Sequence, residues 1–111
     1  MNKIDALNEV EKMWIWLYKH PAHDENYYVK HVAKLQKPWR NNCPVCDLAE
    51  GTCANCLMAW ENQNTTFCTD PESPFRKWQE TTLDNPDCRT MFAGDIIALT
   101  RTIRGRMSAI G

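Results

Sequence analysis

Apolar residues recur at helical spacing near the start of the chain. Over residues 3–19 they return every three or four positions, at Ile4, Leu7, Val10, Trp14 and Leu17. This pattern predicts an α-helix with one buried stripe, which Pro21 should end. The last turn, residues 14–18, is apolar on every side. We therefore expect it to be enclosed by the rest of the fold, as a core anchor, or else by a partner.

The closing part of the chain shows the same spacing over residues 90–105, at Phe92, Ile96, Leu99 and Ile103. It predicts a second long helix. Arg101, Arg104 and Arg106 would lie near its C-terminal end, where the helix dipole favours cations. Gly105 is expected to mark the end of this helix.

Two shorter helices are predicted between these. The first covers residues 24–36, with Asp24 as its N-cap and Tyr28, Val32 and Leu35 as its inner stripe. The second covers residues 74–81, because Ser73 followed by Pro74 is a typical helix start. Strand patterns are weak throughout. The predicted fold class is thus mainly α: a small single-domain helical protein, residues 1–111, with little or no β structure. We expect Trp14, Trp60, Phe75 and Trp78 to join its parts.

Composition excludes some classes of protein. With 43% hydrophobic residues and 10% aromatic residues the chain should fold, and its longest apolar run, residues 13–18, is far too short to span a bilayer. The first residues are charged and show no apolar signal core. We therefore expect a cytoplasmic protein, in which thiols stay reduced.

Five of the six cysteines lie in one polar segment, residues 43–68. Two Cys-x-x-Cys pairs at short separation are typical of a metal site, because each pair turns two thiolates toward one ion. We predict a zinc-stabilised, knuckle-like loop with the ligands Cys43, Cys46, Cys53 and Cys56, and with Cys68 as the alternative ligand. Cys88 is expected to be a free, partly buried thiol. In an oxidising compartment, three disulfides would be the alternative.

Charge is unevenly distributed although the net charge is −1. Residues 47–72 hold five acidic residues and no Lys or Arg. This favours a protein-binding lobe that docks on a basic partner surface through Asp47, Glu50, Glu61 and Trp60. The alternative is a nucleic-acid-binding face on a basic helix, with Lys30, Lys34, Lys37 and Arg40 beside the stacking residues Tyr27 and Trp39.

Enzymatic interpretations have less support. A closed four-thiolate shell leaves no coordination position for substrate. Cys43-Pro-Val-Cys46 lacks the βαβ setting of a redox motif. His23, Glu25 and the first cysteine pair partly match the layout of zinc nucleobase deaminases, a less favoured alternative. We predict no catalytic residues.

The run from Cys43 to Cys68, followed by Ser73-Pro-Phe-Arg-Lys-Trp78, resembles a group of small bacteriophage-encoded cysteine-cluster proteins whose biochemical function is not settled. The resemblance implies a helical chain with an inserted cysteine cluster. It also implies a phage accessory protein that acts in the cytosol of the infected bacterium by binding a host protein.

Overall fold

The computed structural model describes residues 2–37, 39, 42–50, 58, 72–81 and 85–110, with side chains to residue 107. The helices among these residues are α1 (Lys3–Lys19), α2 (Glu25–Tyr27), the π-helical turn η1 (Tyr28–Val32), α3 (Pro44–Leu48), α4 (Pro74–Glu80) and α5 (Pro86–Ile110). No strand occurs within these ranges, which confirms the mainly α, single-domain fold class. None of the helices described is both long and apolar enough to cross a lipid bilayer.

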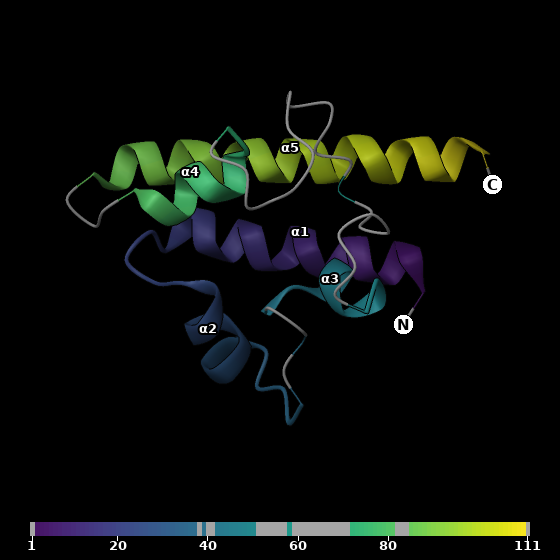
Figure 1. The fold of residues 1–111 in the computed structure, drawn as a ribbon, viewed down its shortest axis with the longest axis horizontal. Coiled ribbons are helices and arrows are strands. Elements are labelled where there is room, and N and C mark those ends of the chain that lie inside the picture. The colour runs from purple at the N-terminus through teal and green to yellow at the C-terminus, as the bar shows by residue number, and fades with distance from the viewer. Residues whose placement is uncertain are drawn as a thin grey trace.

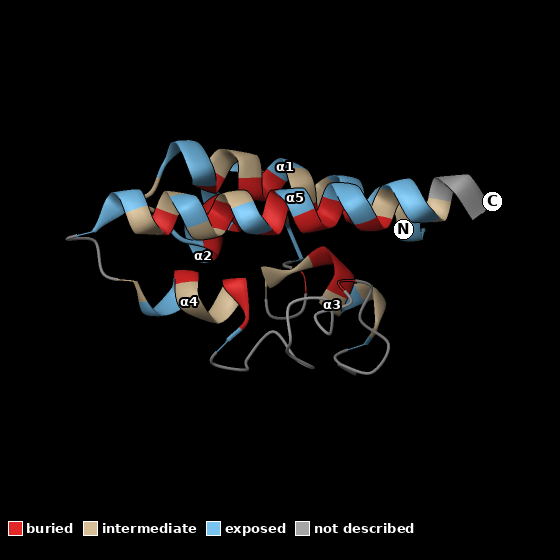
Figure 2. Cartoon of the chain, turned by 90° about the horizontal axis from the view of Figure 1, so that it is seen from above, coloured by how far each residue is buried: buried red, intermediate tan, exposed pale blue. Residues whose placement is uncertain are grey.

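The two long helices, α1 and α5, lie side by side and run in opposite directions (Figure 1). The short helices α3 and α4 cover one face of this pair, with α3 packed against α1 and α4 against α5. The arm, defined here as residues 24–32 of α2 and η1, lies beside α1. Figure 2 shows that the buried residues of α1 and α5 face the interior, while the exposed ones form the outer stripes.

Helix α1 has the predicted range because its sequence supplies both ends. The Oδ1 atom of Asn2 accepts a hydrogen bond from the backbone N–H of Asp5 at 2.8 Å, which caps the first turn. The helix stops at Lys19, two residues before Pro21. Its buried stripe is Ala6, Leu7, Val10, Met13, Trp14 and Leu17. The predicted positions are therefore confirmed, apart from Ile4, which is only half-buried.

The apolar turn at residues 14–18 is enclosed mainly by the protein's own fold. Trp14 and Leu17 are buried, and Trp16 is half-buried beneath the arm. Tyr18, by contrast, is 45% exposed, so the expected enclosure on every side is not reached. The core-anchor interpretation holds for the inner face of this turn.

An aromatic cluster joins α1 to α4. The ring of Trp14 meets the ring of Trp78 edge to face, with centroids 4.8 Å apart and planes at 85°. Phe75 meets Trp14 in the same manner at 6.1 Å. This geometry is the favoured one for aromatic pairs. Three of the four predicted joining residues are thus in contact, and the fourth, Trp60, lies outside the described residues.

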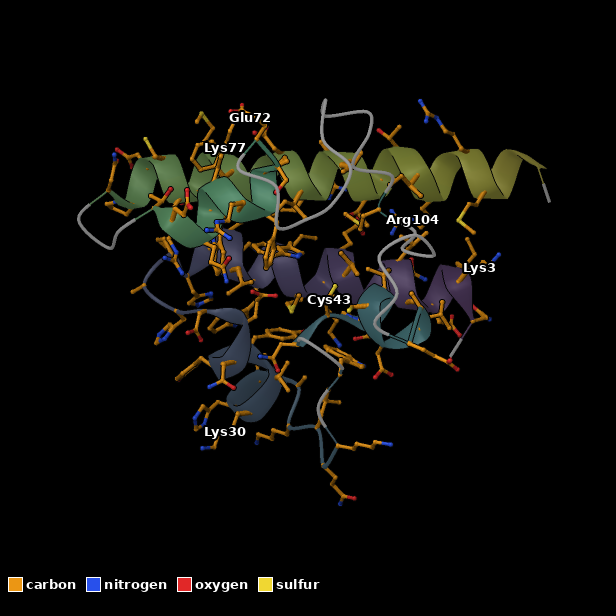
Figure 3. The ribbon with its side chains drawn as sticks, viewed as in Figure 1. Lys3, Lys30, Cys43, Glu72, Lys77 and Arg104 are labelled. Atoms are coloured by element: carbon orange, nitrogen blue, oxygen red, sulfur yellow. The ribbon has the colours of Figure 1, made fainter. Side chains whose placement is uncertain are left out.

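At the other end of the pair, ionic contacts join α1 to α5. Both Glu11 carboxylate oxygens accept hydrogen bonds from Arg104 at 3.0 Å, and Arg101 Nε donates to Glu11 Oε2 at 2.7 Å (Figure 3). Hydrogen bonds from Arg104 are the main reason why the pKa of Glu11 is lowered. Arg101, Arg104 and Arg106 were predicted to complement the helix dipole, but α5 extends to Ile110 and has no basic residue in its last turn, so this role is wrong. Arg101 and Arg104 pair the two helices instead.

The second predicted helix, residues 24–36, is shorter than expected. Asp24 is its N-cap, as predicted, but helical structure ends at Val32. Lys34 has a left-handed backbone (φ 53), and the Leu35 N–H donates to the Val29 carbonyl, which closes the helix end. The π-helical turn also changes the buried positions, so that Val29 is buried while Val32 is 38% exposed. Of the predicted inner stripe, Tyr28 is buried and Leu35 is partly buried against the core, although it lies beyond the helix end, whereas Val32 is wrong.

The last two helices begin with proline. Helix α4 starts at Pro74, and the Ser73 hydroxyl accepts a hydrogen bond from the Arg76 N–H at 3.0 Å, as the Ser-Pro start predicts. Helix α5 extends beyond the predicted residues 90–105 at both ends, from Pro86 to Ile110. The prediction underestimated it because Pro86 occupies the first helical position and the helix continues through Gly105.

Replacing Gly105 by alanine should stabilise the protein. Gly105 has a helical backbone, and an added Cβ would meet nothing within 4 Å. The substitution lowers the backbone entropy of the unfolded chain, so we expect the free energy of unfolding to rise by about 0.4–1 kcal/mol in urea titrations. Gly94→Ala, whose Cβ would lie in ordinary van der Waals contact with Tyr18 Cε2 at 3.4 Å, tests the same effect at a second helical glycine and should gain at least as much. No gain at Gly105 would contradict this account.

Candidate functional site

Helix α3 positions the first cysteine pair. Cys43 is the N-cap residue and Cys46 lies in the first turn, with Pro44 at the first helical position between them. Pro44 and Val45 are buried, whereas both cysteines are only partly buried. The Cys-x-x-Cys turn is thus held against α1 by its two central residues, and Cys43 lies where the chain enters α3 (Figure 3).

Two predicted partner-binding residues lie on the same turn. Asp47 is exposed on α3, and Glu50 is exposed two residues beyond its end with a left-handed backbone (φ 55). The structure therefore brings both acidic residues close to the cysteine pair. Glu72, at the far end of the acidic segment, forms an ion pair with Lys77 of α4 at 3.6 Å (Figure 3). Glu61 and Trp60 lie outside the described residues.

Met58 provides a second anchor for the cysteine segment. It follows Cys56 by two positions, is buried, and its Sδ lies 3.8 Å from the Thr100 hydroxyl of α5. Val45 and Met58 thus both belong to the hydrophobic core. The second Cys-x-x-Cys pair lies between these two anchored positions in the sequence. Cys53, Cys56 and the alternative ligand Cys68 are outside the part of the chain that the structure describes.

The predicted zinc site stays a prediction. Within the described ranges no three His, Cys, Asp or Glu side chains come together as a metal-binding group, but three of the five candidate ligands fall in the gaps of those ranges. Cys88 is half-buried in the first turn of α5, as expected. The deaminase alternative needs His23 beside Cys43 and Cys46, and this group is not among those formed. Instead, the His23 ring stacks on Tyr27.

The predicted basic helical face does not form as a continuous surface of one helix. Lys30 lies on η1, whereas Lys34 and Lys37 follow the end of the helix, although all three are exposed. Arg40 is not described. Trp39, predicted to stack on bases, is buried with 9% exposure and belongs to the core, so that role is wrong.

A group of stacked rings, which sequence reasoning missed, lies between α1 and the arm. The aromatic stack consists of Trp16, His20, His23, Tyr27 and His31. Trp16 and His20 stack with ring centroids 4.1 Å apart, and Tyr27 and His23 with centroids 4.0 Å apart. The spacing of four residues from 16 to 20, from 23 to 27 and from 27 to 31 is the signal that could have indicated it.

A buried polar cluster lies behind this stack. Arg89 of α5 donates to the carbonyl oxygens of Thr81 and His23 at 3.1 and 3.3 Å, and its guanidinium lies 4.1 Å above the Trp78 ring. Glu25 of α2 is 9% exposed. Glu25 Oε2, Trp78 Nε1 and Arg89 Nε are all buried without a hydrogen-bond partner. Burial, with a smaller contribution from Asp24, raises the pKa of Glu25 to about 8, although Arg89 opposes this rise.

Glu25 should make the stability of the protein depend on pH. In the folded state it keeps its proton up to about pH 8, whereas the unfolded chain loses this proton near the ordinary pKa of 4.5. Between these values the unfolded state binds fewer protons, so the free energy of unfolding falls as pH rises. The stabilisation is complete below about pH 4.5 and is lost as pH rises through 8.

Glu25→Gln should remove this component. Urea titrations at pH 5 and at pH 8 give the free energy of unfolding at each pH. From pH 5 to pH 8 this free energy should fall in the wild type by more than about 1 kcal/mol beyond any fall in the variant, because a tenfold change in proton affinity corresponds to about 1.4 kcal/mol. Asp95→Asn, at an exposed position on α5, is the control and should behave like the wild type. Identical pH profiles for wild type and Glu25→Gln would refute the assignment.

Comparison with family models, with curated proteins and with solved structures gives no match for this chain. The function therefore has to be argued from the residues and their geometry.

Proposed function

We propose that this protein is a small, zinc-stabilised, non-enzymatic accessory protein that binds a host protein through an acidic surface beside its cysteine cluster. In keeping with the resemblance to phage proteins, its setting would be the cytosol of an infected bacterium. Binding would inhibit or recruit the host protein.

The observation that carries the proposal is the anchoring of the cysteine segment at two places. Val45 holds the first Cys-x-x-Cys pair against α1, and Met58 is buried beside Thr100 of α5, shortly after the second pair. A segment tied to the core on both sides of its second cysteine pair loses less chain entropy when a metal orders it. This supports Cys43, Cys46, Cys53 and Cys56 as one ligand set, with Cys68 as the alternative.

Four thiolates around zinc form a closed tetrahedral shell, which suits stabilisation and not catalysis. The residues present fit that role, since Cys43 caps and Cys46 lies on a helix of five residues, which is too short to be stable alone. Zinc would supply cross-linking between this turn and the chain that follows. The helical body would then display the loop as a rigid lobe.

The exposed acidic residues favour a partner with a basic surface. Asp47 and Glu50 are exposed next to the cysteine pair, and residues 47–72 hold no Lys or Arg. Four thiolates on one divalent ion add further negative charge. A partner with a basic surface would be attracted to this lobe by electrostatic steering, and Trp60 and Glu61 would extend the contact.

The metal can be tested by native mass spectrometry of protein purified under reducing conditions. We expect one zinc per chain, its loss in Cys43→Ser/Cys46→Ser, and its retention in Cys88→Ser, the control at the cysteine outside the cluster. Serine substitution at Cys53/Cys56 and at Cys68 separates the two ligand sets. Fully reduced protein that carries no zinc under these conditions would refute the zinc site.

The acidic surface can be tested by charge reversal. Affinity capture from bacterial lysate identifies a candidate, and the purified pair then gives a dissociation constant. Asp47→Lys/Glu50→Lys/Glu61→Lys should weaken this binding at least about tenfold and reduce its salt dependence. A control with Asp87→Lys/Asp95→Lys, at exposed positions on α5, should bind as the wild type does. Unchanged affinity after reversal of the acidic lobe would overturn the docking surface, even if zinc is present.

A further inference from the structure

The aromatic stack presents several of its rings at the surface. His20 and His31 are exposed, Tyr27 is 38% exposed, and Trp16 is half-buried at the base. All three histidines of the chain belong to this group. Large rings contribute most to stability when they are buried. Exposed rings held in order therefore call for an explanation other than packing.

Three ring pairs of the stack are nearly parallel, whereas the His31 ring is tilted by 38° to Tyr27 and the His23 ring by 39° to Trp16. The planes of Trp16 and His20 differ by 16°, those of Trp16 and Tyr27 by 17°, and those of Tyr27 and His23 by 23°. His20 is fixed further by a 2.8 Å hydrogen bond between its Nδ1 and the Trp16 carbonyl oxygen. The exposed residues His20 and His31 lie at the two ends of this arrangement. A further flat ring would therefore meet an exposed side chain at His20 or at His31.

Exposed lysines lie on the elements that carry the stack and just after them. Lys19 in the last turn of α1, Lys30 on η1, and Lys34 and Lys37 after η1 are all exposed. Figure 3 shows Lys30 at the outer end of the arm, far from Lys3. Among the described residues, the acidic ones on or facing the arm are Asp24, which is exposed, Glu9, which is half-buried, and Glu25, which is buried with a pKa of about 8 and carries little charge at neutral pH. The surface is therefore attractive to an anion that also carries flat rings.

We propose that the aromatic stack and its surrounding lysines bind single-stranded nucleic acid, with bases stacking on the exposed rings and phosphates contacting the lysines. Stacking on aromatic side chains requires bases that are not already paired and stacked, which excludes a regular duplex. A polyanion without rings could contact the lysines but could not stack on the aromatic side chains. This inference does not depend on the zinc lobe. The proposed binding surface is formed by α1 and the arm together, in place of the single basic helix face that the sequence predicted.

The charge component can be measured by fluorescence anisotropy with labelled oligothymidylate and oligouridylate of about 15 nucleotides. Affinity should fall linearly with the logarithm of salt concentration. Lys30→Gln/Lys37→Gln should reduce the slope by about 0.7 for each phosphate that the protein no longer neutralises. Lys3→Gln/Arg106→Gln is the matched control, since it also removes two exposed positive charges but far from the stack, and it should leave the slope unchanged.

The stacking component is tested separately, at one fixed low salt concentration. Tyr27→Ala should weaken binding at least about fivefold, and Tyr27→Phe, which keeps the ring, should restore it. Because loss of Tyr27 could disturb the arm, His31→Ala, at the exposed end of the stack, provides a second variant and should also weaken binding. In the wild type, bound bases should quench tryptophan fluorescence, and Trp16→Phe should abolish most of that quenching.

Three results would overturn the proposal. The first is no binding of either oligonucleotide at low salt. The second is a sign of attraction to any polyanion. Either wild-type affinity in both Tyr27→Ala and His31→Ala, or an affinity for heparin equal to that for the oligonucleotides, would be such a sign. The third is an equal loss of affinity in the control Lys3→Gln/Arg106→Gln, because it would show that no particular face is used.

Discussion

Trp78 is the residue through which the separate parts of this fold are joined. Its ring and the ring of Trp14 from α1 meet edge to face, with centroids 4.8 Å apart, and the guanidinium of Arg89 from α5 lies 4.1 Å from its centroid. Arg89 in turn holds the carbonyl oxygens of Thr81 and His23. Helices α1, α4 and α5 and the entry to the arm therefore share one buried contact. Aromatic packing supplies the apolar part of this contact. Arg89 supplies hydrogen bonds to two backbone carbonyl groups that would otherwise lose theirs on burial.

This arrangement explains why a buried carboxyl is tolerated. Glu25 lies in the first turn of the arm, close enough to Arg89 for the two charges to interact, yet burial dominates and raises its pKa to about 8. Keeping the proton avoids the large cost of a buried, unpaired carboxylate. The start of the arm is thus held against the body by the hydrogen bond from Arg89 to the His23 carbonyl oxygen, next to the buried, neutral Glu25. The aromatic stack depends on this attachment, because Tyr27 and His31 belong to the arm whereas Trp16 belongs to α1.

The sequence predicted those elements whose signals are local. Asn2, Asp24 and Ser73 each cap the helix that follows, and the three- and four-residue spacing in α1 marks its buried side. It could not predict the end of the second helix, because Lys34 adopts a left-handed backbone without being glycine, so the usual stop signal is missing. Gly105 is the opposite case, a glycine that does not stop its helix. The cysteine pair at residues 43 and 46 was predicted from spacing, but its attachment through Val45 and Met58 depends on long-range packing.

Charge separation follows from the same packing. Helix α3 packs against α1, whereas the arm is a separate element held by Arg89 of α5. The acidic turn with Asp47 and Glu50 therefore belongs to a different part of the molecule from the basic surface with Lys30 (Figure 1, Figure 3). A net charge of −1 therefore describes neither surface. Screening limits the influence of each exposed charge to about 8 Å at physiological salt, so two such surfaces can attract ligands of opposite sign with little interference. The helical body, held together by Trp14, Trp78 and Arg89, is what keeps them apart.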